Sequence, residues 1–527
     1  MGNIDCTYVS GASPKRGEHG DPGIMRWYGL LQAIGIVILV ASLSAFIPGH
    51  HLQAAESGNA ARANLLLPVR SAEPVESLTQ RHLHAIESRL RSELGNEHVP
   101  ISELWRRKLT VLSMSGPLAG VTRSTLETLG DNAFARNALF FALPVVRWIT
   151  SPFLFPLEID GSRARQNQEV DRLLAFISDQ KTRGLAATID NVGDASLTAG
   201  SAASYRKFYL TLIDRFARTG KGGELSLSLK LSALTNDLDA ALGDDTSGQA
   251  KRREIRGALR ELLVAAAAHP ERRIFLRIDM EEHAYKDLTL RLFREVVDEN
   301  PELARMPDGS LRIGVVIQAY LRESARDVTT LAGWARSGGF RVPIRLVKGA
   351  YLEHERESAK RGGRKPPVWD NKSSTDANYE AIAAWMMAHR EMVAPVFATH
   401  NIRTISFVMA LGDHFGVSPD GIEIQMLRGM GDPIKRVVVR MGYHLREYVP
   451  AGTLERGLKY AGRRFQELAS GDNALTRTLH GDFSGVDGRT PQFTGARDLD
   501  DSRSALMILG QPLPVLGTRA GGAVQHP

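Results

Sequence analysis

Cysteine is almost missing from this sequence. The 527 residues contain a single cysteine, Cys6, which lies in a polar N-terminal tail. One cysteine cannot form a disulfide within the chain and cannot build a thiolate metal cluster. Its place in the tail also excludes a cysteine nucleophile in the folded body. The 15 histidines show no ligand spacing such as H-E-x-x-H, so we expect no bound metal.

Clusters of basic residues are missing as well. The formal net charge is +7, but no run of five or more lysines and arginines occurs. A nucleic-acid-binding protein would concentrate these cations in a patch or stripe. We therefore expect no nucleic-acid partner. The composition, 43% hydrophobic and 24% charged, is that of a globular protein with an ample core.

One segment near the N-terminus carries no charged residue. It runs from Gly29 to Pro48 and is close to the length needed to cross a bilayer. We predict an uncleaved membrane anchor; a cleaved signal peptide is the alternative, because "LQAAES" beyond the segment offers a loose cleavage site. Lys15, Arg16 and Arg26 precede the segment, which favours a cytoplasmic N-terminus and an external main body. The side of the membrane stays open.

The region that follows has a mostly helical pattern. It contains a second apolar stretch, Ala138 to Leu157, which Arg147 and three prolines interrupt. A spanning helix is therefore disfavoured, and we interpret this stretch as a helix that covers the main domain. The predicted division of the chain is a polar tail and membrane anchor (1–49), a mostly helical region (50–178), the main domain (179–475) and a flexible C-terminal tail (476–527).

The main domain alternates short apolar runs with helix-length segments. Buried strands separated by helices are typical of a parallel α/β sheet, and eight of them favour a closed barrel. A doubly wound fold would place G-x-G-x-x-G after its first strand, where this chain has "DNVGDA". The eight runs are "LAATI", "LSLSLKLS", "RIFLRID", "LRIGVVIQAY", "VPIRLVKG", "PVFATH", "IEIQML" and "REYVPAG".

Polar side chains gather where these runs end. In a parallel barrel the carboxyl ends of the strands and the loops after them build the active site, so one converging pocket is predicted. Each residue alone could also make a structural ion pair or, for His400, a scaffold hydrogen bond. The residues are Lys230, Asp279, Gln318, Arg345, Lys348, Thr399, His400, Gln425 and Tyr448.

Two adjacent arginines follow the last run. Arg463 and Arg464 lie in "KYAGRRFQEL", late in a predicted helix. Neighbouring guanidinium groups repel each other unless an anion neutralises them, and a carboxylate can bind one of them through two hydrogen bonds. The pair therefore predicts an anion-binding position.

These motifs together resemble the proline dehydrogenase family, which also forms the first catalytic unit of bifunctional proline utilisation proteins. The resemblance covers roughly residues 180 to 470. It is carried by "LSLSLKLSAL", "RIDMEE", "GVVIQAY", "IRLVKGAY", "FATHN", "IQMLRGMGDP" and "REYVPAG" followed by "KYAGRRFQEL".

The resemblance implies a distorted (β/α)8 barrel that binds FAD without a covalent link. It implies oxidation of L-proline to Δ1-pyrroline-5-carboxylate, with electrons passed to a quinone. About 57 residues follow position 470, too few for an aldehyde dehydrogenase domain, so we expect a separate pyrroline-5-carboxylate dehydrogenase to act next.

The resemblance also implies roles for individual residues. For catalysis it implies Lys230, Asp279, Arg345, Tyr448, Arg463 and Arg464. The proline carboxylate would lie against Arg463, Arg464 and Lys230, with Asp279 as a compensating charge. The walls around the proline ring would be Leu346, Tyr351, Tyr448 and Tyr460. The implied FAD contacts are Gln318, Arg345, Lys348, Thr399, His400, Asn401, Gln425 and Glu467.

The chain departs from the family pattern at Met280 and Arg428, and we assign chemistry to neither. Other functions stay open on the residues alone. They are another flavin barrel, such as a methylenetetrahydrofolate reductase, a Schiff-base aldolase with Lys230 or Lys348 as nucleophile, and an inactive membrane-anchored binding protein.

Overall fold

The structure is a computed structural model of the chain, and it describes residues 75–97, 152–157, 163–192, 198–219 and 223–453. The predicted anchor, Gly29 to Pro48, and the predicted C-terminal tail lie outside these residues. Within them, no helix combines the length and the apolar character that a membrane crossing requires.

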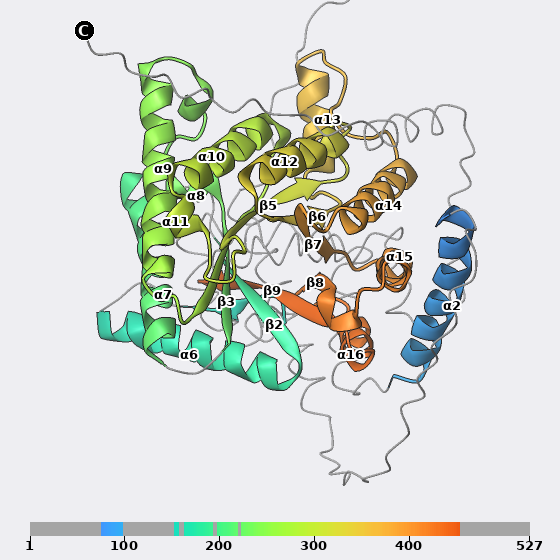
Figure 1. The fold of residues 1–527 in the computed structure, drawn as a ribbon. Helices are drawn as coiled ribbons and strands as arrows, with labels where there is room; N and C mark the ends of the chain where they lie inside the picture. The colour runs from blue at the N-terminus through green and yellow to red at the C-terminus, as the bar shows by residue number, and fades with distance from the viewer. Residues whose placement is uncertain (1–74, 98–151, 158–162, 193–197, 220–222, 454–527) are drawn as a thin grey trace, which may run out of the picture. The chain divides into compact units, whose positions relative to one another are not determined.

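Eight parallel strands close into a barrel (Figure 1). Neighbouring strands pair in chain order from β2 to β9, and β9 pairs with both β2 and β8, which closes the ring. Each strand overlaps one of the eight predicted runs, so the barrel prediction is confirmed. The strands are β2 (Leu185–Asn191), β3 (Glu224–Leu229), β4 (Arg273–Ile278), β5 (Ile313–Gln318), β6 (Val342–Val347), β7 (Val393–Ala398), β8 (Glu423–Leu427) and β9 (His444–Gly452).

A ninth, two-residue strand corrects one prediction. The end of the apolar stretch at 138–157 was predicted to be helical, but β1 (Phe155–Pro156) pairs in parallel with the end of β9. Proline lacks a backbone donor and disfavours a helix interior, which agrees with the turn at Pro152 and the extended chain at Pro156. Leu157 continues the pairing, since its backbone N donates to the carbonyl of Gly452 at 2.8 Å.

Helices lie on the outside of the strands (Figure 1). The long ones are α6 (Arg163–Thr182), α7 (Ala199–Arg218), α9 (Thr246–Ala267), α10 (Lys286–Glu299), α12 (Ser324–Gly338), α14 (Lys372–Ala388), α15 (Ile402–His414) and α16 (Asp432–Arg440). The connections carry α8 (Leu231–Leu234), α11 (Pro301–Ala304), α13 (Leu352–Arg361) and three short 3-10 helices, η1 (Ala240–Leu242), η2 (His283–Tyr285) and η3 (Pro419–Gly421). The predicted boundary at residues 178 and 179 lies inside α6. An earlier helix, α2 (Val75–Gly95), packs against α15 and α16.

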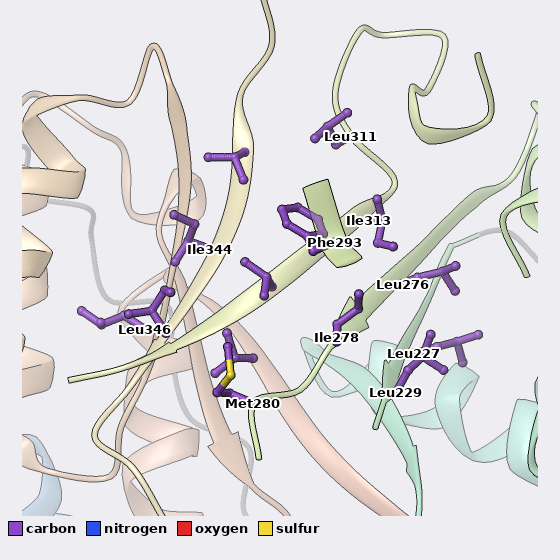
Figure 2. Close-up of a cluster of buried hydrophobic side chains, with 14 of the residues drawn as sticks. Leu227, Leu229, Leu276, Ile278, Met280, Phe293, Leu311, Ile313, Ile344 and Leu346 are labelled. Atoms are coloured by element: carbon purple, nitrogen blue, oxygen red, sulfur yellow. The ribbon is translucent and has the colours of Figure 1, made fainter. Parts of the chain in front are cut away.

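The outward faces of the strands are apolar and pack against the helices. Successive side chains of a strand point to opposite faces, so alternate residues form this layer. Phe293 of α10 packs among the outward residues and is fully buried (Figure 2). The same apolar cluster contains Leu227, Leu229, Leu276, Ile278, Leu311, Ile313, Ile344 and Leu346.

The inward faces carry charges. Arg345 of β6 donates to the hydroxyl of Ser228 on β3 at 3.1 Å, and because these strands are not neighbours the bond crosses the interior. Arg446 of β9 bonds both carboxylate oxygens of Glu423, at 2.8 and 3.1 Å, and pairs with Glu224 at 3.0 Å. Burial alone would raise the pKa of Glu423, but Arg446 holds it well below its usual range. The barrel interior is therefore an ionic network.

Truncation of Phe293 tests the apolar layer. We expect Phe293→Ala to lower the free energy of unfolding by about 3–5 kcal/mol, because a large cavity replaces a fully buried ring. The matched control is Val264→Ala on the outer face of α9, where the side chain is 41% exposed and the loss should stay within about 0.5 kcal/mol. Urea unfolding measures both, and equal losses would contradict the described packing.

Candidate active site

Three of the predicted catalytic residues meet at the carboxyl end of the barrel. Asp279, directly after β4, accepts hydrogen bonds from the Arg345 guanidinium and from the Tyr448 hydroxyl, each at 2.8 Å. The guanidinium carbon of Arg345 also lies 5.4 Å from the centre of the Tyr448 ring. The three residues come from β4, β6 and β9, so only the closed barrel brings them together.

Lys230, directly after β3, joins this group. Its Nζ donates to Asp190 Oδ1 at 2.7 Å, and the Asp190 side chain is only 3% exposed. Burial alone would lower the pKa of Lys230, but the charges of Asp190 and Asp279 raise it above its usual value. The ammonium group therefore stays charged, which suits it to hold an anion.

Asp190 was missed in the sequence analysis, although it directly follows the predicted run "LAATI". A second missed residue is Glu281, which lies two positions after Asp279 in "IDMEE". Its carboxylate accepts hydrogen bonds from the backbone N and the hydroxyl of Ser232, in the short helix after Lys230. Burial raises the pKa of Glu281. Glu281 thus links the loops that follow β3 and β4.

Two glutamines present buried acceptors, Gln318 at the end of β5 and Gln425 in the middle of β8. Gln318 donates its amide to the carbonyl of Glu281 at 3.1 Å, while its Oε1 has no hydrogen-bond partner among the described residues. The Oε1 of Gln425 is likewise without a partner in that part of the chain. Both side chains are 3% exposed, and a buried acceptor gains stability from a donor. Both positions therefore suit a ligand that brings N–H or O–H groups.

Lys348 lies after β6 and has a partner on α14. Its ammonium forms an ion pair with Asp376 and donates to the Thr404 hydroxyl at 3.2 Å. Burial lowers the pKa of Lys348, and Asp376 offsets only part of that effect. The next residue, Gly349, has a φ of 130°, and any Cβ there would lie 2.5 Å from the Tyr320 ring. The chain turns at this glycine.

Thr399, His400 and Asn401 have scaffold roles in the structure. The backbone N of Thr399 donates to the carbonyl of Gln425 at 3.1 Å, and His400 Nε2 accepts from the backbone N of Leu427 at 2.9 Å. The Asn401 side chain caps α15. These bonds lie within the protein scaffold, and contacts of the three residues with FAD stay a prediction.

Leu346 does not lie with the polar group. It is fully buried in the apolar layer, beside Ile344 (Figure 2). Arg345 points into the barrel, so its neighbour in the strand points to the opposite face. The contact of Leu346 with substrate stays a prediction. Tyr351 lies where α13 begins and is half-buried.

Four predicted site residues follow the end of β9 and lie outside the described residues. They are Tyr460, Arg463, Arg464 and Glu467, and their roles stay predictions.

The two departures from the family pattern make contacts other than those of Asp279 and Lys230. Met280 packs in the apolar layer (Figure 2), and Arg428 lies over the Phe176 ring and pairs with Glu447 at 3.5 Å. Among the described residues, no group of three or more His, Cys, Asp or Glu side chains has the arrangement of a metal site.

The fold and the charged strand ends define a (β/α)8 barrel whose candidate catalytic side chains gather at its carboxyl end, as in enzymes of this fold. The sequence model of the family described as proline dehydrogenase matches residues 173–477, more than half of the chain. The chain therefore belongs to the proline dehydrogenase family.

Relatives and solved structures agree with this assignment. "Bifunctional protein PutA" of Klebsiella aerogenes is 30% identical over 332 residues, which is 61% of this chain but 24% of that protein. "Proline dehydrogenase 2" of Bacillus subtilis (strain 168) is 26% identical over 294 residues, 56% of this chain and 82% of that one. The chain thus spans about a quarter of the bifunctional relative.

A crystal structure of proline utilization A from Bdellovibrio bacteriovorus, inactivated by N-propargylglycine, superposes with a TM-score of 0.66. It is 25% identical, and the match covers 82% of this chain and 44% of that one. The Bradyrhizobium japonicum protein, at 22% identity and a TM-score of 0.58, supports the fold alone.

A double-mutant cycle measures the Asp190 and Lys230 pair. Lys230→Met alone should destabilise the protein by about 3 kcal/mol or more, because Asp190 is left charged and buried. Combined with Asp190→Asn, the cycle should give a coupling of about 1–3 kcal/mol in urea unfolding. The control cycle on the exposed pair of Asp214 and Arg218 should give about 0.3–0.5 kcal/mol.

The pH dependence of this coupling has a defined sign. A lysine whose folded pKa is raised contributes stability that is fully present below its unfolded pKa, and this stability is lost only as the pH rises through the folded pKa. The unfolded value for Lys230 is 10.5. We expect the same coupling at about pH 7 and about pH 9, and a coupling that disappears by pH 9 would contradict the raised pKa.

Proposed function

We propose that the protein oxidises L-proline to Δ1-pyrroline-5-carboxylate with FAD as cofactor and a quinone as the final electron acceptor. The observation that carries the proposal is the meeting of Asp279, Arg345 and Tyr448 beside the Lys230 ammonium. All four residues lie within the segment that matches the proline dehydrogenase family.

FAD fits the polar groups at this end of the barrel. A flavin ring presents N–H and carbonyl groups along its edge, and the buried Oε1 atoms of Gln318 and Gln425 need donors. The diphosphate is anionic, and the half-buried Lys348 supplies a cation. When bound, FAD supplies a two-electron acceptor for the hydrogen that leaves the proline ring.

Substrate binding is proposed for the cations at the strand ends. Lys230, held by Asp190, would attract the proline carboxylate, with Arg463 and Arg464 as further partners. Asp279 fixes the orientation of both Arg345 and Tyr448, since each of its oxygens accepts one of their hydrogen bonds. The Tyr448 ring would then form a fixed wall for the pyrrolidine ring, with Tyr351 and Tyr460 as the other aromatic walls.

The membrane role is part of the same proposal. A quinone dissolves in the bilayer, and an anchor from Gly29 to Pro48 would hold the barrel beside it. The product would pass to a pyrroline-5-carboxylate dehydrogenase.

Spectroscopy under anaerobic conditions tests the proposed function. The purified protein should be yellow, and L-proline should bleach its flavin absorbance. A colourless protein that borohydride traps covalently with its substrate would favour the aldolase. A yellow protein that a reduced folate bleaches and proline does not would favour the methylenetetrahydrofolate reductase alternative.

Substitution of the arginine pair tests the substrate position. In Arg463→Met or Arg464→Met we expect the KM for proline to rise at least about tenfold, because a charge-assisted hydrogen bond is worth about 1.5–3 kcal/mol. The flavin should stay bound, as its absorbance would report. Loss of flavin with an unchanged KM would assign the pair to the cofactor instead.

A carbonate wash tests the anchor. Full-length protein should stay in the membrane pellet after the wash, whereas a chain that starts near residue 55 should be released and should still reduce an artificial acceptor. Release of the full-length protein would contradict a spanning helix.

A further inference from the structure

Two tyrosines behind the candidate site have no role in the function proposed so far. Tyr205 and Tyr209 lie four residues apart on α7 and therefore share one face of the helix. They are 7% and 0% exposed, and their rings meet edge to face with centres 5.0 Å apart. Both hydroxyls reach the carboxyl ends of β2 and β3.

Each hydroxyl bonds the backbone beside a charged site residue. Tyr209 donates to the carbonyl of Ser228 at 2.7 Å and accepts from the backbone N of Asn191 at 2.9 Å. Tyr205 accepts from the backbone N of Lys230 at 3.2 Å, and the two hydroxyls are themselves 3.3 Å apart. The hydroxyls thus connect the end of β2 with the end of β3.

These bonds begin where the strand pairing stops. The pairing between β2 and β3 runs from Thr188 with Ser226 to Asp190 with Ser228. Beyond that point, Asn191 and Lys230 bond the tyrosine hydroxyls through their backbone N atoms. Asp190 directly precedes the bonded Asn191. The hydroxyl bridge therefore fixes the backbone on both sides of the ion pair between Asp190 and Lys230.

We propose that Tyr205 and Tyr209 are positioning residues for the substrate carboxylate. They set the separation of the β2 and β3 ends, so that the Asp190 carboxylate holds the Lys230 ammonium at a fixed place in the pocket. This inference rests on the proposed function, because it assigns the carboxylate of the substrate to Lys230. Neither tyrosine touches the substrate; both act through the strand ends.

The hydroxyls remain protonated over the working range of pH. Burial raises the pKa of both tyrosines above the usual value, so the bridge does not titrate with the substrate. Loss of the hydroxyl bridge should therefore change the affinity for a carboxylate and should add no new transition to the pH profile of activity.

Phenylalanine substitutions test the positioning role. Tyr209→Phe removes the bonds to Ser228 and Asn191. Tyr205→Phe removes the bond to Lys230 and leaves the two bonds of Tyr209 in place. We expect the KM for proline to rise about five- to tenfold in Tyr209→Phe and about two- to fivefold in Tyr205→Phe, on the scale of lost hydrogen bonds. The kcat should change less than twofold.

The matched control is Tyr379→Phe on α14. Tyr379 is also fully buried and donates its hydroxyl to a strand carbonyl, that of Leu346, at 3.3 Å. Its loss should reduce stability in a similar way and leave the KM for proline within twofold. A rise in KM common to all three variants would contradict the positioning role, because general loosening of the barrel would account for it.

Two inhibitors test whether the tyrosines affect binding of the carboxylate or binding of the ring. Cyclopentanecarboxylate carries the carboxylate on a five-membered ring, and cyclopentylmethanol lacks the charge. Inhibition by the first should weaken in Tyr209→Phe as the KM rises, and inhibition by the second should not change. Equal weakening of both inhibitors, or an unchanged KM in both tyrosine variants, would overturn the inference.

Flavin reduction in the unmodified protein shows whether a negative result counts against this inference or against the proposed function. If the unmodified protein does not reduce its flavin with proline, the proposed function fails first. If it does, and the tyrosine variants match it in KM and inhibitor affinity, only the positioning role fails. Should Tyr209→Phe not fold, the milder Tyr205→Phe still decides between these outcomes.

Discussion

The Asp279 carboxylate is the group on which the rest of the candidate site depends. One of its oxygens accepts from Arg345 and the other from Tyr448, so residues from three strands converge on one anion. The Arg345 side chain is only 4% exposed, and a buried cation without a counter-charge is strongly destabilising. Asp279 therefore stabilises the folded barrel and fixes the site geometry at the same time.

Other buried charges in the barrel interior also have counter-charges. Arg446 is matched by Glu423 and Glu224 near the amino ends of the strands, and Lys230 is matched by Asp190 near the carboxyl ends. Arg277 lies between the two and donates to backbone carbonyls; burial and the nearby Arg345 lower its pKa to about 9. Because buried ion pairs restrict side-chain motion, we expect Arg446, Lys230 and their carboxylate partners to keep these positions before substrate binds.

The sequence predicts the fold because each strand contains a short apolar run that is recognisable between helix-length segments. The strand-end residues followed from the barrel, since parallel strands gather their carboxyl ends at one face. The ion pair between Asp190 and Lys230 was harder to predict, because the two residues are 40 positions apart in the sequence and only the closed barrel brings them together. The two-residue β1 has no period to detect, and Tyr205 and Tyr209 look like ordinary core residues in the sequence.

Leu346 is a residue whose predicted role rests on the resemblance alone. Its place in "RLVKGAY" predicts a substrate contact, and strand alternation places its side chain opposite that of Arg345, in the buried layer under the helices. The sequence predicts this alternation if the Arg345 side chain is assumed to point into the barrel. The predicted roles of Arg463 and Arg464 rest on the resemblance and on the general need of paired guanidinium groups for an anion.

The central claim is that Asp279 orders the site, and the rate of flavin reduction by proline tests it most directly. Anaerobic stopped-flow mixing should show reduction at least about tenfold slower in Asp279→Asn, with flavin still bound, because the change removes the negative charge and replaces one of the two accepting oxygens with an NH2 donor. Asp308→Asn, an exposed aspartate paired with Arg273, should react like the unmodified protein. An unchanged rate in Asp279→Asn would contradict the account.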